Sequence, residues 1–120
     1  MHQEIFDEAF SQVIWISYRK GFTPLTRQLI VNQDLTRSMI AKQTVRQITS
    51  DCGWGCMIRC SQMLLANTLR RLLPSKHTRD ILALFLDQPE APFSLHSMCE
   101  QGRDLMGKEP GDWYGVNSIA

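Results

Sequence analysis

The chain has 120 residues and a formal net charge of +1, and 43% of its residues are hydrophobic. This size fits one domain, and the composition is that of a soluble globular chain with enough apolar side chains for a core. The near balance of charge excludes electrostatic recognition of a nucleic acid as the main function, so we expect no nucleic-acid partner.

The sequence shows neither a membrane span nor a secretory signal. The longest apolar run, ILALFL at residues 81–86, is far shorter than a transmembrane helix. The amino end, MHQEIFDEAF, carries acidic residues and lacks a cationic head followed by an apolar stretch. We therefore expect a cytoplasmic protein with no transmembrane segment, whose four cysteines are reduced thiols.

The first third of the chain changes character along its length. Residues 4–19 place apolar side chains at helical spacing and predict a helix, although the run VIWISY near its end is β-like. Gly21 and Pro24 break this segment. From Thr26 to Thr49 the sequence is locally basic, contains no aromatic residue and has little regular pattern. This stretch predicts a mobile loop with room for a short helix.

The densest apolar pattern follows. Residues 56–73 carry apolar side chains on more than one helical face, which predicts a helix buried by neighbours on several sides and ended by Pro74. A second helix is expected at residues 78–87. A third begins near Ser94 or Ser97 in our prediction.

Ser97 and Glu100 have the spacing of a capping box. A loop containing Gly107 then precedes DWYG. Asn117 or Ser118 is placed to cap a further helix that would begin where the sequence stops, which is the pattern of a truncated domain.

The segment SDCGWGCMIRC, residues 50–60, predicts a reactive thiol. Cys56 stands where a helix begins, and the unpaired N–H groups and partial positive charge of a helix start favour a thiolate with a lowered pKa. The same N–H groups can bind the oxyanion formed when a thiolate attacks a carbonyl. Gly53 and Gly55 leave room for a substrate backbone, and Trp54 can fix the loop by packing. The residues alone nevertheless favour the other interpretation, a glycine turn in which Cys56 is a small buried side chain, because a free cysteine is usually structural.

The other cysteines suggest a second kind of site. Cys52, Cys56 and Cys60 are spaced by four residues, which resembles a metal-binding or redox motif. Zinc sites built on paired cysteines need a matching second half, and none follows, so we expect no metal and no cofactor. In our interpretation Cys60 is a core residue, Cys52 a loop residue, and Cys99 a residue of its own helix.

The histidines provide no obvious general base. His2, His77 and His96 are each interpreted as surface or capping residues. A cysteine nucleophile needs a base and an orienting group that lie close in space, and the sequence pattern identifies no such pair.

Several blocks of the sequence resemble one known family in order. TSDCGWGCMIRCSQMLLANTL is similar to the active-site segment of the autophagins, the autophagy-related cysteine proteases with a papain-like fold. IWISYRKGF, ILALFLDQPEAPFSLH and DWYGVNSIA resemble the segments before and after it. The resemblance implies an α+β papain-like domain, of which residues 1–120 form the mainly helical, nucleophile-bearing part. The sheet that carries the catalytic histidine would lie beyond the end.

The resemblance also assigns roles to individual residues. It makes Cys56 the nucleophile and Tyr18 a support for the oxyanion, through a phenol O–H that donates a hydrogen bond. It places Trp113 over the narrow groove that receives the glycine tail of the substrate. Gly55 and Trp54 belong to the same substrate-binding region, and Trp54 with Asp51 supports the turn before the nucleophile.

Three features depart from the family pattern. Residues 24–48 resemble an insertion, because the link between Tyr18 and Cys56 is longer than usual. Ser61 replaces a glycine commonly found there. The downstream Asp-x-His segment is absent because the sequence ends first, so we expect the separate fragment to be nearly inactive.

The activity implied by the resemblance is that of a cysteine endopeptidase. It cleaves after a glycine near the end of a ubiquitin-like autophagy modifier, both in the precursor and in the conjugate with phosphatidylethanolamine. Two alternatives remain open at this point. One is a shortened paralogue that binds the modifier without cutting it, and the other is a redox or metal-binding helical protein.

Overall fold

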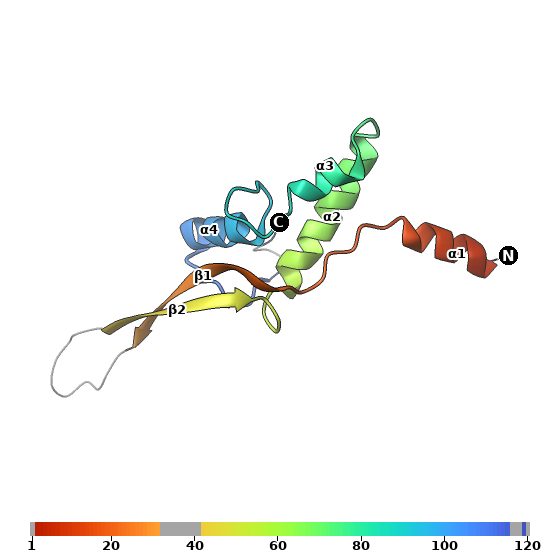
Figure 1. Ribbon diagram of the computed structural model, residues 1–120. Coiled ribbons are helices and arrows are strands. Elements are labelled where there is room, and N and C mark those ends of the chain that lie inside the picture. Colours follow the sequence, from red (N-terminus) through yellow and green to blue (C-terminus); the bar gives the residue numbers. More distant parts are fainter. Residues whose placement is uncertain (1, 32–41, 116–118, 120) are drawn as a thin grey trace.

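The computed structural model describes residues 2–31, 42–115 and 119, and it combines helices with one small sheet (Figure 1). In chain order the elements are α1 (His2–Ser11), β1 (Lys20–Val31), β2 (Lys42–Ser50), α2 (Cys56–Leu72), α3 (Thr78–Ala83) and α4 (Leu95–Met106). Within the described residues more of the chain is helical than extended, as expected. No helix in this part of the chain is long and apolar enough to cross a lipid bilayer.

The predicted loop between Thr26 and Thr49 is instead largely a β-hairpin, so that prediction was wrong for its described residues. β1 and β2 pair antiparallel, and their register runs from Leu25 opposite Ile48 to Val31 opposite Lys42. A register shift separates this ladder from the pair Lys20–Ser50. Cross-strand pairing of β-branched and apolar residues favours such strands, and a search for helical spacing does not detect them. The chain therefore contributes a sheet of its own.

The helix predicted at residues 4–19 ends early. α1 stops at Ser11, and the segment that follows is extended, with Ile14 and Ile16 buried and Val13 and Trp15 exposed. That alternation is the period of a strand and explains the β-like appearance of VIWISY. Asn67 of α2 fixes this segment, because its amide accepts the Ile14 N–H (2.9 Å) and donates to the Ile14 carbonyl (3.0 Å).

The long central helix is confirmed, but not its burial on several sides. α2 begins at Cys56 and ends just before Leu73 and Pro74. Its buried residues are Ile58, Arg59, Gln62 and Ala66, which form one stripe at helical spacing. The other apolar side chains of α2 are half-buried or exposed, and Leu64 is 72% exposed.

Of the two helices after α2, the first is shorter than predicted and the second begins at one of its two predicted starts. α3 ends at Ala83 rather than near residue 87. α4 begins after Ser94, as one of the two predictions had it, and the Ser94 hydroxyl accepts the Ser97 N–H at 3.0 Å; the capping box predicted at Ser97 and Glu100 is therefore wrong. α4 ends at Gly107, which has φ 66°. The cap predicted for a further helix, at Asn117 or Ser118, lies outside the described residues.

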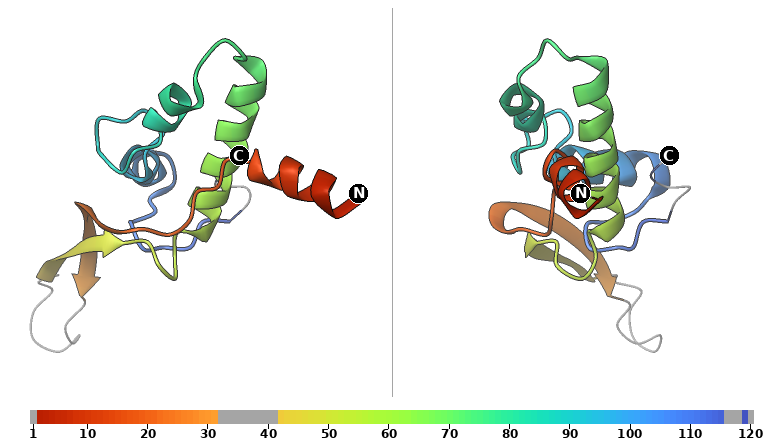
Figure 2. Two further views of the ribbon diagram at one scale, coloured as in Figure 1. Left: turned by 45° about the vertical axis from the view of Figure 1, so that its right-hand side comes forward. Right: turned by 90° about the vertical axis from the view of Figure 1, so that its right-hand side faces the viewer.

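Two apolar clusters form the core, one at the start of the buried stripe of α2, through Ile58, and one further along it, through Ala66. The first contains Phe22, Leu25, Trp54, Ile58, Leu95, Cys99 and Tyr114, so it joins the hairpin to α2, α4 and the last loop. The second contains Ile14, Ile16, Ala66, Ile81 and Phe85, and joins the extended segment to α2 and α3. Figure 2 shows the hairpin extending from the amino-terminal end of α2, with α3 beside its other half.

The molecule is elongated and leaves much apolar surface uncovered. Its radius of gyration is 18.4 Å, whereas a compact domain of this length has about 14 Å. α1 buries none of its residues and projects away from the rest (Figure 1). Exposed large apolar side chains occur in several elements: Ile5, Phe6, Phe10, Val13, Trp15, Leu64, Leu72, Leu82, Leu86 and Leu105. Patches of this kind are typical of surfaces that another part of a protein covers.

We therefore expect the 120-residue chain to self-associate when it is produced alone. Burying the apolar faces of α1 and α2 between copies removes them from water, which stabilises aggregates over monomers. Light scattering during a concentration series should show growing particles, and thermal unfolding should be irreversible. A monomer that unfolds sharply and refolds on cooling would contradict this prediction.

Candidate active site

The turn before α2 is organised around Asp51, which is fully buried. One oxygen of its carboxylate accepts the backbone N–H of Arg19 at 2.8 Å, and the other accepts Arg59 Nε at 2.7 Å. Its backbone carbonyl accepts the N–H groups of Trp54 (3.2 Å) and Gly55 (2.9 Å). Asp51 therefore joins the segment that carries Tyr18 to the turn that leads into Cys56.

Arg59 is the buried cation that balances Asp51. Its side chain is 2% exposed, and its guanidinium pairs with Asp51 at 2.7 Å and with Asp87 at 2.9 Å. Asp87 also pairs with Arg19 at 3.1 Å. Burial alone would lower the pKa of Arg59, but the hydrogen bonds and ion pairs with the two aspartates raise it above its usual value. The network thus links the residue before β1, Arg19, to α2 and to Asp87, which follows α3.

The two glycines of the GWG turn are each required for a different physical reason. Gly53 has φ +87°, a conformation that other residues rarely adopt. A Cβ on Gly55 would lie 2.6 Å from Asp51 Oδ2 and 2.7 Å from Asp51 Cβ, so a side chain there would displace the carboxylate. The absence of a side chain at Gly55 is therefore explained by Asp51 in the folded chain.

Cys56 occupies the first position of α2, as the sequence predicted. Gly55 is the N-cap and has no side chain with which to bond the first backbone N–H groups of the helix. Cys56 is partly exposed, so the residue is neither buried in the core nor fully in solvent. Unpaired amides and the helix dipole at this end can stabilise negative charge on a sulfur or on an oxyanion beside it.

Tyr18 lies next to Cys56, although 38 positions separate them in the sequence. The pKa of the Tyr18 phenol is raised, first because its surroundings desolvate it, then because the Cys56 thiol lies against it, and finally because Asp51 and Cys52 are also close. A phenol with a raised pKa keeps its proton at neutral pH and remains a hydrogen-bond donor.

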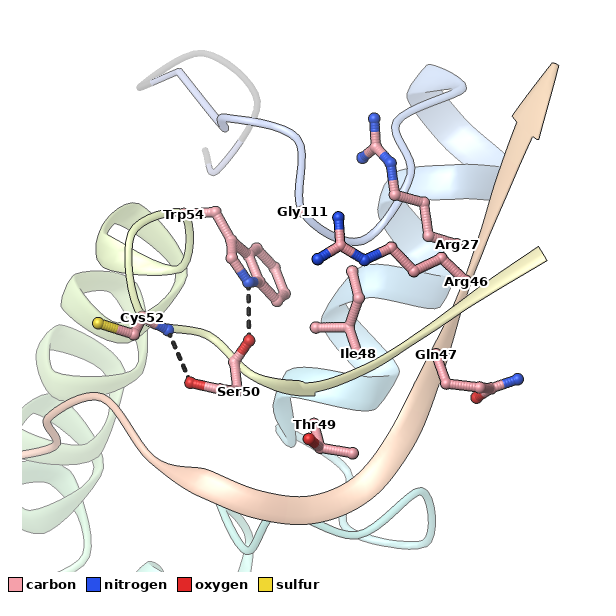
Figure 3. Close-up of a pocket in the computed structure, with 9 residues that line it drawn as sticks. All are labelled: Arg27, Arg46, Gln47, Ile48, Thr49, Ser50, Cys52, Trp54 and Gly111. Carbon is pink, nitrogen blue, oxygen red and sulfur yellow. Dashed lines mark hydrogen bonds between the residues drawn. The ribbon is translucent and has the colours of Figure 1, made fainter. Parts of the chain in front are cut away.

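Trp54 packs into the first apolar cluster and is 8% exposed. Its indole Nε1–H donates to the Ser50 carbonyl at 2.9 Å, which closes the turn on itself (Figure 3). Trp54 also forms one wall of a surface hollow of about 670 Å³ beside the hairpin. The side chain therefore stiffens the turn and presents an edge to this hollow.

The loop after α4 carries Trp113, whose side chain is 75% exposed. No hydrogen bond or ring contact joins this side chain to Cys56 in the part of the chain that the structure describes. Its neighbour Tyr114 is anchored in the first cluster, and a Cβ on Gly102 would lie 2.6 Å from the Tyr114 hydroxyl. The loop is thus fixed through Tyr114 rather than through Trp113.

The remaining cysteines differ from our predictions in one case. Cys60, expected in the core, is exposed, because the buried stripe of α2 passes through Ile58 and Arg59 instead. Cys52 is an exposed loop residue and Cys99 is buried in α4, both as predicted. Burial raises the pKa of the Cys99 thiol to about 12, while the Tyr114 hydroxyl beside it and Arg103 oppose the shift.

The three histidines do not approach Cys56. The prediction that His96 is a surface or capping residue is wrong, because it is 7% exposed, packs edge-on against Phe22 and bonds through Nε2 to the Thr23 carbonyl, and Ser94 is the cap of α4. His77 precedes α3 as its N-cap and is exposed, and His2 is exposed in α1. Among the described residues no group of three His, Cys, Asp or Glu side chains is arranged to hold a metal ion.

Sequence reasoning missed the cation that holds the site together. Arg59 lies in the apolar run of residues 56–73, where a charged side chain on the same stripe as Ile58, Gln62 and Ala66 was a usable signal. A charge on the buried face of a helix requires a buried partner. Which carboxylates would meet it, Asp51 and Asp87, depends on tertiary structure.

Comparison with known proteins shows which proteins this chain is similar to. Residues 3–120 match the profile of the peptidase C54 catalytic domain. A probable cysteine protease atg4 of Penicillium rubens is 39% identical over an alignment that covers 92% of this chain and 31% of that protein. The cysteine protease atg4 of Emericella nidulans is 37% identical, with coverage of 98% and 33%. A probable cysteine protease ATG4 of Pichia angusta is 38% identical, with coverage of 89% and 24%. The chain spans about a third of the length of the curated relatives it matches.

We predict that Arg59→Ala lowers the free energy of unfolding, so that the chain opens far more often. The matched control Arg71→Ala, at the exposed end of α2, should have little effect. Without Arg59 the fully buried Asp51 carboxylate loses its cation, while Asp87 keeps Arg19, and an uncompensated buried charge costs about 3–5 kcal/mol. Cys99 is 1% exposed, so iodoacetamide reaches it only when the chain opens.

The labelling rate of Cys99, followed by mass spectrometry in dilute protein, should rise by about a hundredfold or more in Arg59→Ala. Arg71→Ala should change it by less than about threefold, as expected for a surface substitution. Equal rates in the two variants would show that Arg59 does not hold the fold.

Proposed function

Because this chain belongs to the peptidase C54 family, we propose that it carries the nucleophile of a cysteine peptidase and that Cys56 is this nucleophile. The observation that carries the proposal is the position of Cys56 as the first residue of α2, partly exposed and with the Tyr18 phenol near it. A thiol, a protonated phenol and helix amides without a side-chain cap then lie at one end of α2, which supplies a nucleophile and donors for an oxyanion.

The reaction follows from this geometry. The Cys56 thiolate attacks the carbonyl carbon of the scissile bond, and a C–S bond forms while the carbonyl electrons move to oxygen. The Tyr18 O–H and the first N–H groups of α2 donate hydrogen bonds to this oxyanion. The C–N bond then breaks, the amine leaves with a proton, and a thioester on Cys56 remains. Water attacks the thioester, which releases the acid and returns the thiol.

The proton acceptor for this reaction is proposed to lie outside these 120 residues. His96 is held by Phe22 and Thr23 in the core, and no histidine bonds to Cys56 in the described part of the chain. The chain spans about a third of its relatives' length, so most of such a protein is not represented here. We propose that a histidine of an Asp-x-His segment completes the site, within a papain-like domain, and that the 120-residue chain alone is nearly inactive.

The proposed substrate is a ubiquitin-like autophagy modifier, cut after a glycine near its carboxyl end. Relatives that carry the name cysteine protease atg4, together with the autophagin resemblance, support this substrate class. The phosphatidylethanolamine conjugate of the modifier is the second proposed substrate, acted on in the cytoplasm. Trp113, exposed as it is, is free to cover the glycine tail, and Gly55 and Trp54 are proposed to line the approach to Cys56.

A second candidate function is modifier binding without cleavage. It is favoured by one observation, namely that none of the three histidines within this chain's described residues is placed as a base for Cys56. Both candidate functions expect the 120-residue chain alone to be nearly inactive, so the distinguishing assay uses a protein that joins this chain to the rest of a C54 domain. Turnover by that protein supports the peptidase, and binding without turnover supports the second candidate.

We predict that Cys56→Ala abolishes cleavage in a protein that joins this chain to the rest of a C54 domain. Removal of the nucleophile should lower kcat by about a thousandfold or more. Binding of the modifier, measured by titration calorimetry, should persist because the thiol makes few of the contacts. Cys60→Ala, one turn further along α2 and exposed, is the matched control and should retain turnover. Cleavage that survives in Cys56→Ala rules out the assigned nucleophile.

We also predict that Tyr18→Phe slows the same protein without weakening substrate binding. The phenyl ring keeps its packing but cannot donate to the oxyanion, and loss of one such donor lowers kcat by about a hundredfold. KM should change little, because the hydrogen bond forms in the transition state. A variant with normal kcat and raised KM would instead make Tyr18 a binding residue.

A further inference from the structure

A surface hollow of about 670 Å³ lies between the β-hairpin, the turn before α2 and the loop that contains Gly111. Figure 3 shows Arg27 and Arg46 extending from neighbouring strands toward the side where Trp54 and Gly111 lie. Its volume is within the range of about 300–1,000 Å³ that is usual for binding sites. The hollow is therefore large enough for several residues of a peptide.

The positive charge of this hollow follows from the register of the hairpin. Arg27 lies directly opposite Arg46, and the preceding pair on the same face is Leu25 opposite Ile48. Leu25 is buried and Ile48 packs against the first cluster. Both arginines are therefore carried by the face of the hairpin that covers the core, and like charges placed opposite each other destabilise a strand pair.

Only one of these two charges is balanced within the described residues. Arg27 Nη1 donates to Asp112 at 2.7 Å and to the Pro110 carbonyl at 2.9 Å, which ties β1 to the last loop. Gly111 permits this approach, because a Cβ there would lie 3.2 Å from Arg27 Nη1. Arg46 is exposed and forms no ion pair in this part of the chain, and none of the lining residues described is acidic.

We propose that this hollow binds an acidic peptide segment, with Arg46 as the residue that pairs with its carboxylate. A carboxylate near Arg46 would relieve the repulsion with Arg27, and the guanidinium can bind it through two N–H groups. Ile48 and the Trp54 edge provide apolar contact for the rest of the segment. The identity of the peptide segment rests on the function proposed above. Under that function the segment belongs to the protein substrate, because Trp54, which lines the hollow, lies two positions before Cys56 in the sequence.

The test measures binding directly and does not depend on cleavage. The probe is an end-capped eight-residue peptide of alternating Glu and Ala, and its control has Gln in place of Glu. Trp15 and Trp113 are exposed, so the full chain with Trp15→Phe and Trp113→Phe keeps Trp54 as its sole fluorescent tryptophan. The Glu peptide should change the Trp54 emission in a saturable and salt-sensitive way, and the Gln peptide should bind at least about tenfold more weakly.

Charge substitutions locate the site. Arg46→Glu should weaken binding of the Glu peptide by about tenfold or more, whereas Arg46→Lys should weaken it by only about threefold. Arg79→Glu, the same change at an exposed arginine of α3 outside the hollow, should leave binding unchanged. Arg46→Gln provides a milder loss of charge if Arg46→Glu does not fold, and it too should weaken binding.

Equal binding of the Glu and Gln peptides would overturn the proposal. So would equal losses in the Arg46 and Arg79 variants, or binding that is insensitive to salt. Since Cys56 takes no part in peptide binding, failure of the nucleophile assignment would leave these results unchanged, and failure here would leave the nucleophile assignment intact.

Discussion

Asp51 is completely buried, and a buried carboxylate must meet both a cation and hydrogen-bond donors if the fold is to form. Arg59 supplies the cation, the Arg19 backbone supplies a donor, and Asp87 completes the pairing of the two arginines. This arrangement fixes three segments that are distant in sequence: the approach to the hairpin, the start of α2 and the end of the α3 region. The two apolar clusters pack on either side of it. Without Arg59 the same apolar contacts would leave the Asp51 carboxylate in the interior with no cation.

The geometry of the reactive thiol follows from that constraint. The Asp51 carbonyl accepts the two N–H groups that bend the chain into α2, and its carboxylate holds the residue next to Tyr18. The phenol and the Cys56 thiol thus lie near each other because their neighbours, Arg19 and Gly55, both donate backbone hydrogen bonds to Asp51. Gly55 belongs to the same constraint, since a Cβ there would overlap Asp51. The chemistry proposed for Cys56 therefore depends on Asp51, a buried residue for which no substrate contact is proposed.

The local features of the site could be predicted from the sequence, but its tertiary partners could not. Cys56 at the start of a long helix, Trp54 as a packing residue and the loop at Gly107 follow from local patterns, and the structure agrees with each. The hairpin was missed because its strands are defined by pairing between residues about 20 positions apart. Cys60 was placed in the core because apolar residues surround it in sequence, but Arg59 takes the buried position for electrostatic reasons. The pairing of Tyr18 with Cys56 came from family resemblance and not from any pattern in the residues.

The contact between Gly102 and Tyr114 shows how a helix interior can set the position of a distant loop. Alanine favours helices over glycine by up to about 1 kcal/mol, so helix propensity alone would select a larger residue at position 102. The phenol oxygen occupies the space where that methyl group would stand. Helix propensity and the placement of the loop that carries Trp113 therefore favour different residues at position 102, and glycine is the residue that the loop placement requires.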